Sequence, residues 1–470
     1  MTDAGLAVTA LHSLLGDRIL GPDSKSYDEH RRVWNAVHDR RPALIARCVN
    51  AVEVSSVLRY ARSAGLAVTV RGGGHNVAGR AVSDASVMID LSLMRGVSVD
   101  PSARSARAQG GCLLRDLDAA TTPHGLACPA GVVSHTGLGG LALGGGYGWL
   151  ARRWGLTCDH ILAAEVVLAD GSIVEATESA HSELLWALRG GGGNFGVVTR
   201  FTLRLRPVGP VVHRTGVYSM GDGVDALAAY REFAEQQSAE LHTVGAFKIA
   251  SEQDWIPAKL RGRPTLHLTA AWFGDPGDGD DAVRPLFDKF APAGRLERVL
   301  SFSDLQALGD HSEPHGHRYF TKSCYLGEIS PAVAEAMVRN AEEIRSPRSC
   351  VDFEYLGGAI TDVPDEDSAF PWRAAPYMYT ASAHWTDPNA DDEEAAWSRR
   401  SIARLDKWHY GGSYVNYVQD QPSSGSIDIY GADRYRRLAE IKRRYDPDNL
   451  LRHNQNIAPE RSLAEDQQIA

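Results

Sequence analysis

Three clusters of glycine lie within residues 38–208 and limit what this part of the chain can fold into. They occupy residues 72–74, 137–148 and 190–196. Because glycine lacks a Cβ, a glycine-rich loop can turn sharply and lie flat against a ligand, and its free N–H groups suit a diphosphate. A single cluster predicts a turn, whereas three in one block predict several loops that close on one extended ligand.

The first cluster is the most specific of the three. It follows an apolar, strand-like run at residues 66–70, and it is flanked by Arg71 on one side and by His75 and Asn76 on the other. The histidine would then lie beside the chemical group that is attached to the diphosphate. The alternative interpretation is a turn at the end of a strand with an incidental histidine.

The other two clusters exclude some nucleotide-binding classes. Gly137, Gly139 and Ala142 match a loose dinucleotide fingerprint, but no clear strand precedes them and no acidic residue follows at the expected distance. The third cluster lacks the Gly-Lys-Ser/Thr of a P-loop, which disfavours hydrolysis of a nucleoside triphosphate.

Length and composition narrow the class of protein. A chain of 470 residues exceeds what one hydrophobic core usually supports, so we expect at least two domains. A net charge of −10 argues against nucleic acid as the main partner, and no apolar run is long enough to predict a membrane span. Six scattered cysteines without a Cys-x-x-Cys pair predict no zinc cluster and, with no signal peptide, a cytoplasmic location.

The pattern of strand-like and helix-like segments changes near residue 210. Before it, strand-like and helix-like segments alternate, with a hairpin at 164–175 and a helix at 182–188. From there to about 410, strand-like runs such as 265–272 and 377–383 alternate with helices, and the pattern predicts an α+β domain with an antiparallel sheet.

Two further strands carry residues of chemical interest. Residues 413–418 read as an aromatic strand that places Tyr414, Asn416 and Val418 on one face and Tyr417 on the other. Residues 351–355 read as a strand whose two acids, Asp352 and Glu354, share a face. The histidines at 311, 315 and 317 lie in a Ser/Glu/Pro/Gly-rich segment that we interpret as a solvated loop, so we predict no metal site.

Several motifs occur in the order in which one known family carries them. They are the Arg-Gly-Gly-Gly-His-Asn run at 71–76, the block 129–148, the Gly-Asn-Phe-Gly-Val-Val-Thr run at 193–199 and the Tyr-Asp-Pro-Asp-Asn-Leu run at 445–450. On these motifs the chain resembles the FAD-linked oxidoreductases of the vanillyl-alcohol-oxidase fold, and more narrowly their berberine-bridge-enzyme-like branch. Its 105–150 segment is most similar to bacterial members of specialised metabolism, among them a flavin-N5-oxide oxygenase and an oxidase of a nicotine derivative.

The resemblance implies an α+β fold in three parts. Residues 1–208 would form an FAD-binding domain of the PCMH type, made of two α/β subdomains. Residues 209–412 would form a substrate-binding domain whose antiparallel sheet is covered by helices, and 413–470 would return to the FAD domain. We expect a monomer or a homodimer that takes a small-molecule substrate and O2.

The resemblance also implies how FAD is held. His75 occupies the place of the histidine that bonds covalently to the flavin 8α-methyl group, and a neutral imidazole is a suitable nucleophile for that bond. Many relatives add a second link from a cysteine where this chain has Val133, and Cys128 lies five residues earlier, so we predict a single link. The residues predicted to bind FAD are Arg71, Gly72, Gly73, Gly74, His75, Asn76, Gly79, Val132, Thr136, Gly137, Gly139, Gly140, Gly144, Tyr147, Gly148, Gly196, Val198, Asn416 and Asn454.

Catalytic residues follow from the same resemblance. Tyr417 is the predicted base, although a tyrosine needs its pKa lowered from about 10 to act as one. Tyr379 matches another position that carries a catalytic residue in relatives, and Asp352 matches an acid of the substrate domain. For the two tyrosines the alternative is an ordinary aromatic residue of a sheet, and for Asp352 it is solvent exposure. Thr136, Leu141 and Tyr147 resemble the residues around the oxygen pocket on the flavin face of a relative.

Three functions remain open at this level. The first is an oxidase that takes a hydride from an alcohol or amine carbon of a small, cyclic metabolite and gives the electrons to O2 as H2O2. The second is an oxygenase that uses a flavin-N5-oxide or a related adduct. The third is a flavoprotein without catalytic activity. The two tyrosines favour the oxidase, and the block 129–148 favours the oxygenase.

Overall fold

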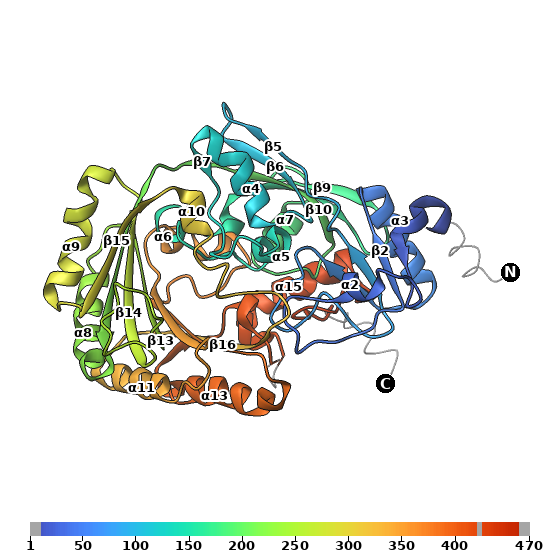
Figure 1. Cartoon of the computed structure of the whole chain (residues 1–470). Helices are drawn as coiled ribbons and strands as arrows, with labels where there is room; N and C mark the ends of the chain where they lie inside the picture. The colour runs from blue at the N-terminus through green and yellow to red at the C-terminus, as the bar shows by residue number, and fades with distance from the viewer. Residues whose placement is uncertain (1–10, 421–424, 460–470) are drawn as a thin grey trace.

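The computed structural model describes residues 11–420 and 425–459 as two regions placed side by side (Figure 1). Residues before about 208 form the region that carries a four-stranded, a five-stranded and a two-stranded sheet, the last made of β7 (Leu126–Ala127) and β11 (Arg206–Pro207), and residues 211–411 form one large sheet. This arrangement confirms the predicted α+β fold. The domain boundaries at 208 and 412 stay a prediction. No helix among the described residues is long and apolar enough to cross a membrane.

The first small sheet positions the loop that carries His75. Its order is β1-β2-β4-β3, with β2, β4 and β3 parallel to one another. Helix α3 (Ala51–Ser63) begins where the Asn50 side chain accepts a hydrogen bond from the Glu53 N–H at 2.9 Å, as a helix N-cap does. The strands are β1 (Ile19–Leu20), β2 (Leu44–Arg47), β3 (Val68–Arg71) and β4 (Val87–Asp90).

The second small sheet is antiparallel, in the order β5-β6-β10-β8-β9. The predicted hairpin is confirmed as β8 and β9, and the predicted helix at 182–188 is confirmed as α7 (Ser182–Leu188). The strands are β5 (Val97–Asp100), β6 (Ser105–Gln109), β8 (Ile161–Val167), β9 (Ile173–Ala176) and β10 (Val197–Arg204). Helices α4 (Leu114–Thr121) and α5 (Leu138–Leu143) connect them.

The large sheet has eight antiparallel strands in the order β15-β12-β14-β13-β17-β18-β16-β19. Helices α11 (Pro331–Glu342) and α13 (Asp391–Ala403) cover one face, and α8 (Gly223–Ala234) and α9 (Gly279–Lys289) extend this layer (Figure 1). The opposite face is turned toward the glycine-rich region. The strands are β12 (Val211–Ser219), β13 (Leu241–Ile249), β14 (Pro264–Trp272), β15 (Gly294–Leu300), β16 (Arg318–Leu326), β17 (Cys350–Tyr355), β18 (Tyr377–Trp385) and β19 (His409–Gly411).

The end of the chain returns to the first region, as the resemblance implies. In helix α15 (Ala432–Tyr445), the fully buried Lys442 ammonium donates to the Asp446 carboxylate at 2.5 Å and to the Asn194 backbone oxygen at 2.8 Å. Asp446 in turn accepts the N–H groups of Leu450 and Leu451, both at 2.8 Å. This buried network ties the Tyr-Asp-Pro-Asp-Asn turn to the third glycine cluster.

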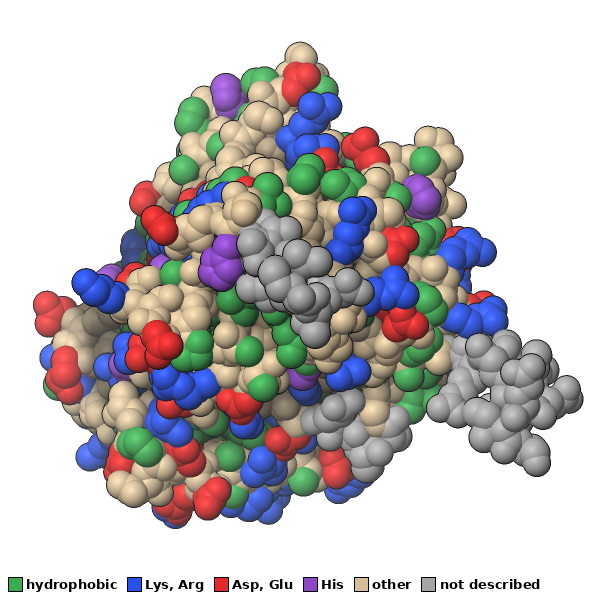
Figure 2. All heavy atoms as spheres, turned by 90° about the vertical axis from the view of Figure 1, so that its right-hand side faces the viewer, with side chains coloured by type: hydrophobic (Ala, Val, Ile, Leu, Met, Phe, Trp, Pro, Cys, Tyr) green, Lys and Arg blue, Asp and Glu red, His purple; other side chains and the backbone are tan. Residues whose placement is uncertain are grey.

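Two features of the chain surface and of the C-terminal segment complete the fold. On the face seen in Figure 2, acidic and basic side chains are interspersed. The predicted aromatic strand at 413–418 is wrong: these residues follow the short strand β19 and form a single 3-10 turn, Val415–Tyr417. Their aromatic composition is typical of strands, but their side chains pack against the glycine-rich segment instead of pairing with a neighbouring strand.

Candidate active site

The three glycine clusters meet at one place, as the sequence predicts. A Cβ on Gly73 would lie 2.5 Å from the backbone nitrogen of Gly137, so only glycine allows the first two clusters to touch. The N–H of Gly192 donates to the Leu143 oxygen at 2.9 Å, which joins the second cluster to the third. The loops therefore close around a common space.

The remaining predicted FAD residues serve this convergence in different ways. Side chains at several glycines would overlap neighbouring atoms, so these positions allow the loops to pack: Gly79, Gly139, Gly144, Gly148 and Gly196. A Cβ at Gly140 would meet no atom within 4 Å. The Asn76 side chain accepts the Ala78 N–H at 3.1 Å and shapes its own loop, while Arg71 donates to the backbone oxygen of His30. Val132 and Thr136 are half-buried, and Val198 is buried in β10.

His75 lies in a cluster of rings. Trp34 stacks on its imidazole with centroids 4.2 Å apart, and the rings of His135 and His315 lie 5.0 and 6.1 Å away. Burial, followed by the His135 and His315 imidazoles, holds the pKa of His75 well below its usual value. The ring is therefore neutral at physiological pH, and its buried Nε2 has no hydrogen-bond partner among the described residues.

The stack continues from Trp34 into the large sheet. Tyr319 of β16 stacks on Trp34 at 3.6 Å, and His384 of β18 stacks on Tyr319 at 4.3 Å. The Trp34 indole N–H also donates to the backbone oxygen of Glu313 at 2.9 Å. A continuous column of rings thus connects the His75 loop to the sheet of the second region.

The second attachment position holds no cysteine, as the sequence predicts. Val133 is half-buried, and its neighbour Ser134 donates through its hydroxyl to the Asp310 carboxylate at 2.6 Å. Cys128 is fully buried, and burial raises the pKa of its thiol above the usual value, which leaves it unreactive. Neither residue offers a second nucleophile.

Sequence reasoning gave Tyr414 no role, and the structure gives it a central one. Its buried hydroxyl accepts the N–H groups of Gly146 and Tyr147 at 3.0 and 3.3 Å. Asn416 donates to the same hydroxyl at 2.9 Å and to the Leu141 oxygen at 3.2 Å. The two side chains therefore fasten the bend of the long glycine-rich segment. Aromatic residues beside a glycine run are the signal that could have indicated this contact.

Polar atoms without partners line the meeting point of the loops. Asn454 donates to the backbone oxygen of Gly193 at 3.1 Å, yet its own side-chain oxygen has no partner within the described part of the chain. The side-chain oxygens of Gln455 and Asn456 are in the same state. Buried polar atoms are almost always hydrogen-bonded, so these groups fit a polar ligand such as FAD.

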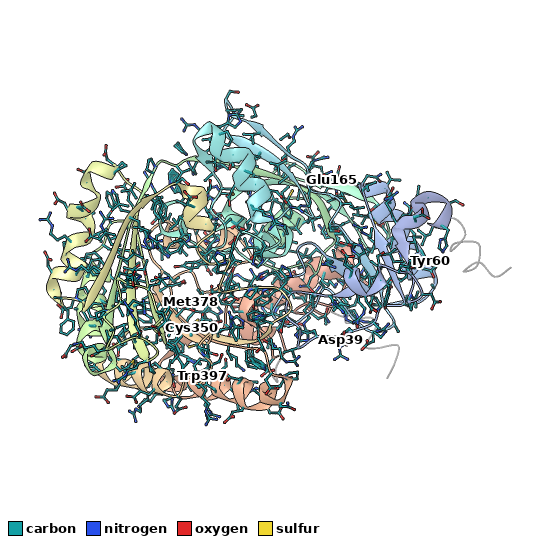
Figure 3. The ribbon with its side chains drawn as sticks, in the orientation of Figure 1. Asp39, Tyr60, Glu165, Cys350, Met378 and Trp397 are labelled. Atoms are coloured by element: carbon teal, nitrogen blue, oxygen red, sulfur yellow. The ribbon has the colours of Figure 1, made fainter. Side chains whose placement is uncertain are left out.

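The inner face of the large sheet carries two acidic side chains from β17. Asp352 and Glu354 are half-buried although β17 lies near the middle of the sheet with helices on its other face. Met378 of the neighbouring strand β18, labelled in Figure 3, packs with Leu143 and Tyr147 of the glycine-rich region, so this face of the sheet is turned toward that region. The predicted shared face of the two acids is confirmed.

Several titratable groups around these acids have shifted pKa values. Burial, followed by the Asp352 carboxylate, raises the pKa of Glu354 and of Glu313 to about 8. Burial and the Glu354 carboxylate raise the pKa of Tyr417 well above its usual value. A catalytic base needs the opposite shift, so Tyr417 is protonated at neutral pH and the carboxyl groups are the better proton acceptors.

Tyr379 lies on the wrong face of its strand for catalysis. It is completely buried in the core beneath the helices, and its hydroxyl accepts a hydrogen bond from Asn340 of α11 at 2.7 Å. Trp397, in the helix layer of Figure 3, donates to the backbone oxygen of the same Asn340 at 3.0 Å. The prediction of a catalytic Tyr379 is wrong. Side chains alternate along the strand, so Met378, and not Tyr379, lies on the face that is turned toward the glycine-rich region.

The histidines of the predicted solvated loop have separate positions. His311 and His315 are exposed, and the His315 ring lies 5.0 Å from that of His135. His317 bonds to His384 through ring nitrogens 2.8 Å apart. In residues 11–420 and 425–459, no group of three or more His, Cys, Asp or Glu residues is arranged to hold a metal ion.

Glycine loops with open polar atoms and a neutral histidine at their edge fit a flavin-dependent oxidoreductase. Comparison with known proteins agrees. The family model described as FAD binding domain matches residues 42–177, and the one described as Berberine and berberine like matches residues 413–458.

The similarity extends over most of the chain. The chain is 30% identical to an FAD-linked oxidoreductase of Pyricularia oryzae, over 77% of this chain and 73% of that protein. It is 29% identical to the (R)-6-hydroxynicotine oxidase of Paenarthrobacter nicotinovorans, over 94% and 97% of the two chains. The crystal structure of 6-hydroxy-D-nicotine oxidase from Arthrobacter nicotinovorans superimposes with a TM-score of 0.84 at 27% identity, covering 95% and 98%.

The chain belongs to the berberine-bridge-enzyme-like family of FAD-linked oxidoreductases. The residues fit FAD on the evidence of the open loops, the partnerless oxygens and the free Nε2 of His75.

Proposed function

We propose that this protein is an oxidase that takes a hydride from an alcohol or amine carbon of a small, cyclic specialised metabolite and produces H2O2 from O2. The pair of half-buried acids on β17, on the face of the large sheet that is turned toward the glycine-rich region, is the observation that carries the proposal. FAD, when bound, supplies the hydride acceptor.

His75 would hold FAD through one covalent bond. The support is its neutral, partnerless imidazole and the absence of a usable thiol at Val133 or Cys128. Acid precipitation tests the link: yellow protein with flavin mass on a peptide that contains His75 supports it, and colourless protein with all FAD in the supernatant contradicts it.

Asp352 would accept the proton that leaves the substrate nitrogen or oxygen. Burial raises the pKa of its carboxyl, which brings its proton affinity closer to what neutral pH requires. The Tyr417 hydroxyl, protonated beside the same acids, would hold the reacting group by a hydrogen bond.

Anaerobic mixing of the FAD-loaded protein with amines and alcohols tests this function. We expect the oxidised flavin band to bleach with a substrate, and Asp352→Asn to slow bleaching by roughly 10²- to 10⁴-fold. Asp225→Asn, the same change at an exposed position of α8, is the control. A panel in which only dithionite bleaches the flavin would indicate a flavoprotein without catalytic activity.

An oxygenase is the second candidate, and one observation favours it. The buried Tyr147 lies beside Leu141 in the bend fastened by Tyr414, at the positions where the resemblance implies an oxygen pocket. One H2O2 for each substrate turned over supports the oxidase, whereas 18O from 18O2 in the product supports the oxygenase. A cytoplasmic location and a monomeric or homodimeric state stay predictions.

A further inference from the structure

Residues 301–310, which lead from β15 toward β16, lie along the segment that precedes the second glycine cluster. A Cβ on Gly309 would lie 2.8 Å from the backbone oxygen of Val132, so the two backbones approach closely. The Asp310 carboxylate accepts both the N–H and the hydroxyl of Ser134, at 2.8 and 2.6 Å. A part of the large-sheet region thus runs directly beside the glycine-rich segment.

The centre of this contact is a buried pair formed by a carboxyl group and an amide. Asp118 of α4 is 4% exposed, and Gln306, the last residue of α10 (Phe302–Gln306), is 1% exposed. The Gln306 amide nitrogen donates to the Gly131 backbone oxygen at 3.0 Å and to Asp118 Oδ2 at 3.5 Å. Because the Gly131 oxygen can only accept, it fixes which end of the amide is the nitrogen.

Two oxygens of the pair lack a donor. Asp118 Oδ1 and Gln306 Oε1 are buried, and neither has a hydrogen-bond partner among the residues that the structure describes. If Asp118 is ionised, both atoms are acceptors, and two buried acceptors without donors cost free energy. A single proton on the carboxyl supplies the missing donor, because a carboxylic acid and an amide can join through two hydrogen bonds in a ring.

No cation compensates an ionised Asp118. Within residues 11–420 and 425–459 it forms no ion pair, and burial raises the pKa of its carboxyl to about 7, although the Gln306 side chain lowers it. The buried thiol of Cys128 is the one titratable group whose pKa responds to this carboxylate. The other titratable groups on α4 and on the elements packed against it are exposed or half-buried: Asp100, Arg115, Asp116, His124 and Asp304.

We propose that a proton on Asp118 completes a ring of two hydrogen bonds with Gln306, and that this pair positions the glycine-rich segment through Gly131. Loss of the proton removes one bond and leaves a buried charge without a cation. The segment should therefore separate from residues 301–310 more readily as the pH rises. Asp118 and Gln306 are positioning residues, since any effect on FAD passes through the glycine-rich segment.

The pH dependence has a fixed sign. In the closed contact the pKa of Asp118 is about 7, and in an open, solvated contact it returns to its ordinary 3.8. Because the pKa of the closed form is the higher one, the contact is most stable at low pH and weakens as the pH rises toward 7. Between pH 5.5 and pH 8.5 its opening constant should increase about 30-fold.

Hydrogen exchange measured by mass spectrometry tests the proton. The FAD-loaded, full-length wild type and Asp118→Asn are compared at each pH on peptides from residues 129–135 and 301–310. Asparagine keeps the shape and a donor but does not titrate, and the comparison at equal pH cancels the intrinsic pH dependence of exchange. We expect the ratio of wild-type to variant rates to rise about 30-fold between pH 5.5 and pH 8.5. A ratio that stays constant overturns the proposal.

A control and a second comparison keep the test decisive. Asp225→Asn, the same change at an exposed position of α8, should exchange like the wild type at every pH. If Asp118→Asn does not fold, the wild type is read alone, with peptides of α11 as the internal reference at each pH. The same rise is then expected for residues 129–135, and equal behaviour of the two sets of peptides contradicts the proposal.

The bound flavin provides a spectroscopic signature of positioning. The visible circular dichroism of FAD should change between pH 5.5 and pH 8.5 in the wild type and stay nearly constant in Asp118→Asn. A change of equal size in both proteins contradicts a positioning role of Asp118. Neither measurement uses turnover, so a protein without an oxidisable substrate would leave this inference standing, and a flat exchange ratio would leave the proposed oxidase untouched.

Discussion

Lys442→Met is expected to destabilise the C-terminal segment strongly, because the variant leaves a carboxylate buried without its cation. The Lys442 ammonium makes three hydrogen bonds in the folded protein, to Asp446, Asn194 and Leu451, at 2.5, 2.8 and 3.1 Å. Methionine has a similar length and fills the same space. The variant therefore tests the charge and the hydrogen bonds more than the packing.

The expected cost follows from the burial of the pair. Both side chains are completely buried, and breaking such a pair by removing one partner typically costs about 3–5 kcal/mol. Two N–H donors, from Leu450 and Leu451, still stabilise the Asp446 carboxylate, which favours the lower end of that range. At about 1.4 kcal/mol for each factor of ten, backbone amides in this segment should exchange hydrogen roughly a hundred- to a thousandfold faster.

Native-state hydrogen exchange measured by mass spectrometry checks the prediction on peptides from residues 438–451. Arg436→Met is the matched control, because its partner Asp433 and the arginine itself are exposed on the same helix and such pairs contribute little. The double variant Lys442→Met/Asp446→Asn removes the stranded charge, so it should exchange more slowly than Lys442→Met alone. Equal exchange in the single and double variants would refute the electrostatic reasoning.

Three shorter predictions concern the flavin loops. His75→Ala should lose all acid-stable flavin while still binding FAD reversibly, which is checked by comparing the yellow colour of native and acid-precipitated protein; flavin that stays attached would contradict the role of His75. Gly73→Ala places a Cβ 2.5 Å from the Gly137 nitrogen, so we expect a loss of about 1–3 kcal/mol and lower flavin content by absorbance, with Gly209→Ala, where a Cβ meets nothing within 4 Å, as the unaffected control. Tyr414→Phe strands two buried N–H groups of the glycine-rich segment and should cost about 1–3 kcal/mol in urea unfolding; a stability equal to wild type would show that these bonds are dispensable.

Local patterns predicted the elements that have their own periodicity. Helix α7 and the β8–β9 hairpin follow from patterns complete within a few residues, an apolar run and an Ala-Asp-Gly turn. The strand prediction for residues 413–418 was wrong, because aromatic residues suit a strand and equally suit a turn that packs on a neighbouring loop. Which of the two forms depends on contacts with residues some 270 positions away, as with the bond from Tyr414 to Gly146.

The candidate site, too, was predicted from local patterns and missed where distant contacts decide. The shared face of Asp352 and Glu354 was predicted because side chains alternate along a strand, whereas the role of Asp352 stays a prediction. Tyr379 was misplaced because its sequence does not say which side of β18 the helices cover. The environment of His75 was invisible in the sequence, since Trp34, His135 and His315 come from three distant segments.

The column of rings from His75 through Trp34 and Tyr319 to His384 has a consequence for hybrid proteins. It spans the junction between the flavin region and the large sheet, and each ring packs directly on the next. Exchanging the large sheet for that of a relative would replace the last two rings and keep the first two. Chimeras of this family should therefore be built with position 34 and position 319 exchanged together, because a mismatched pair would shift the ring of His75, the proposed attachment point of FAD, although the residues of its own loop stay unchanged.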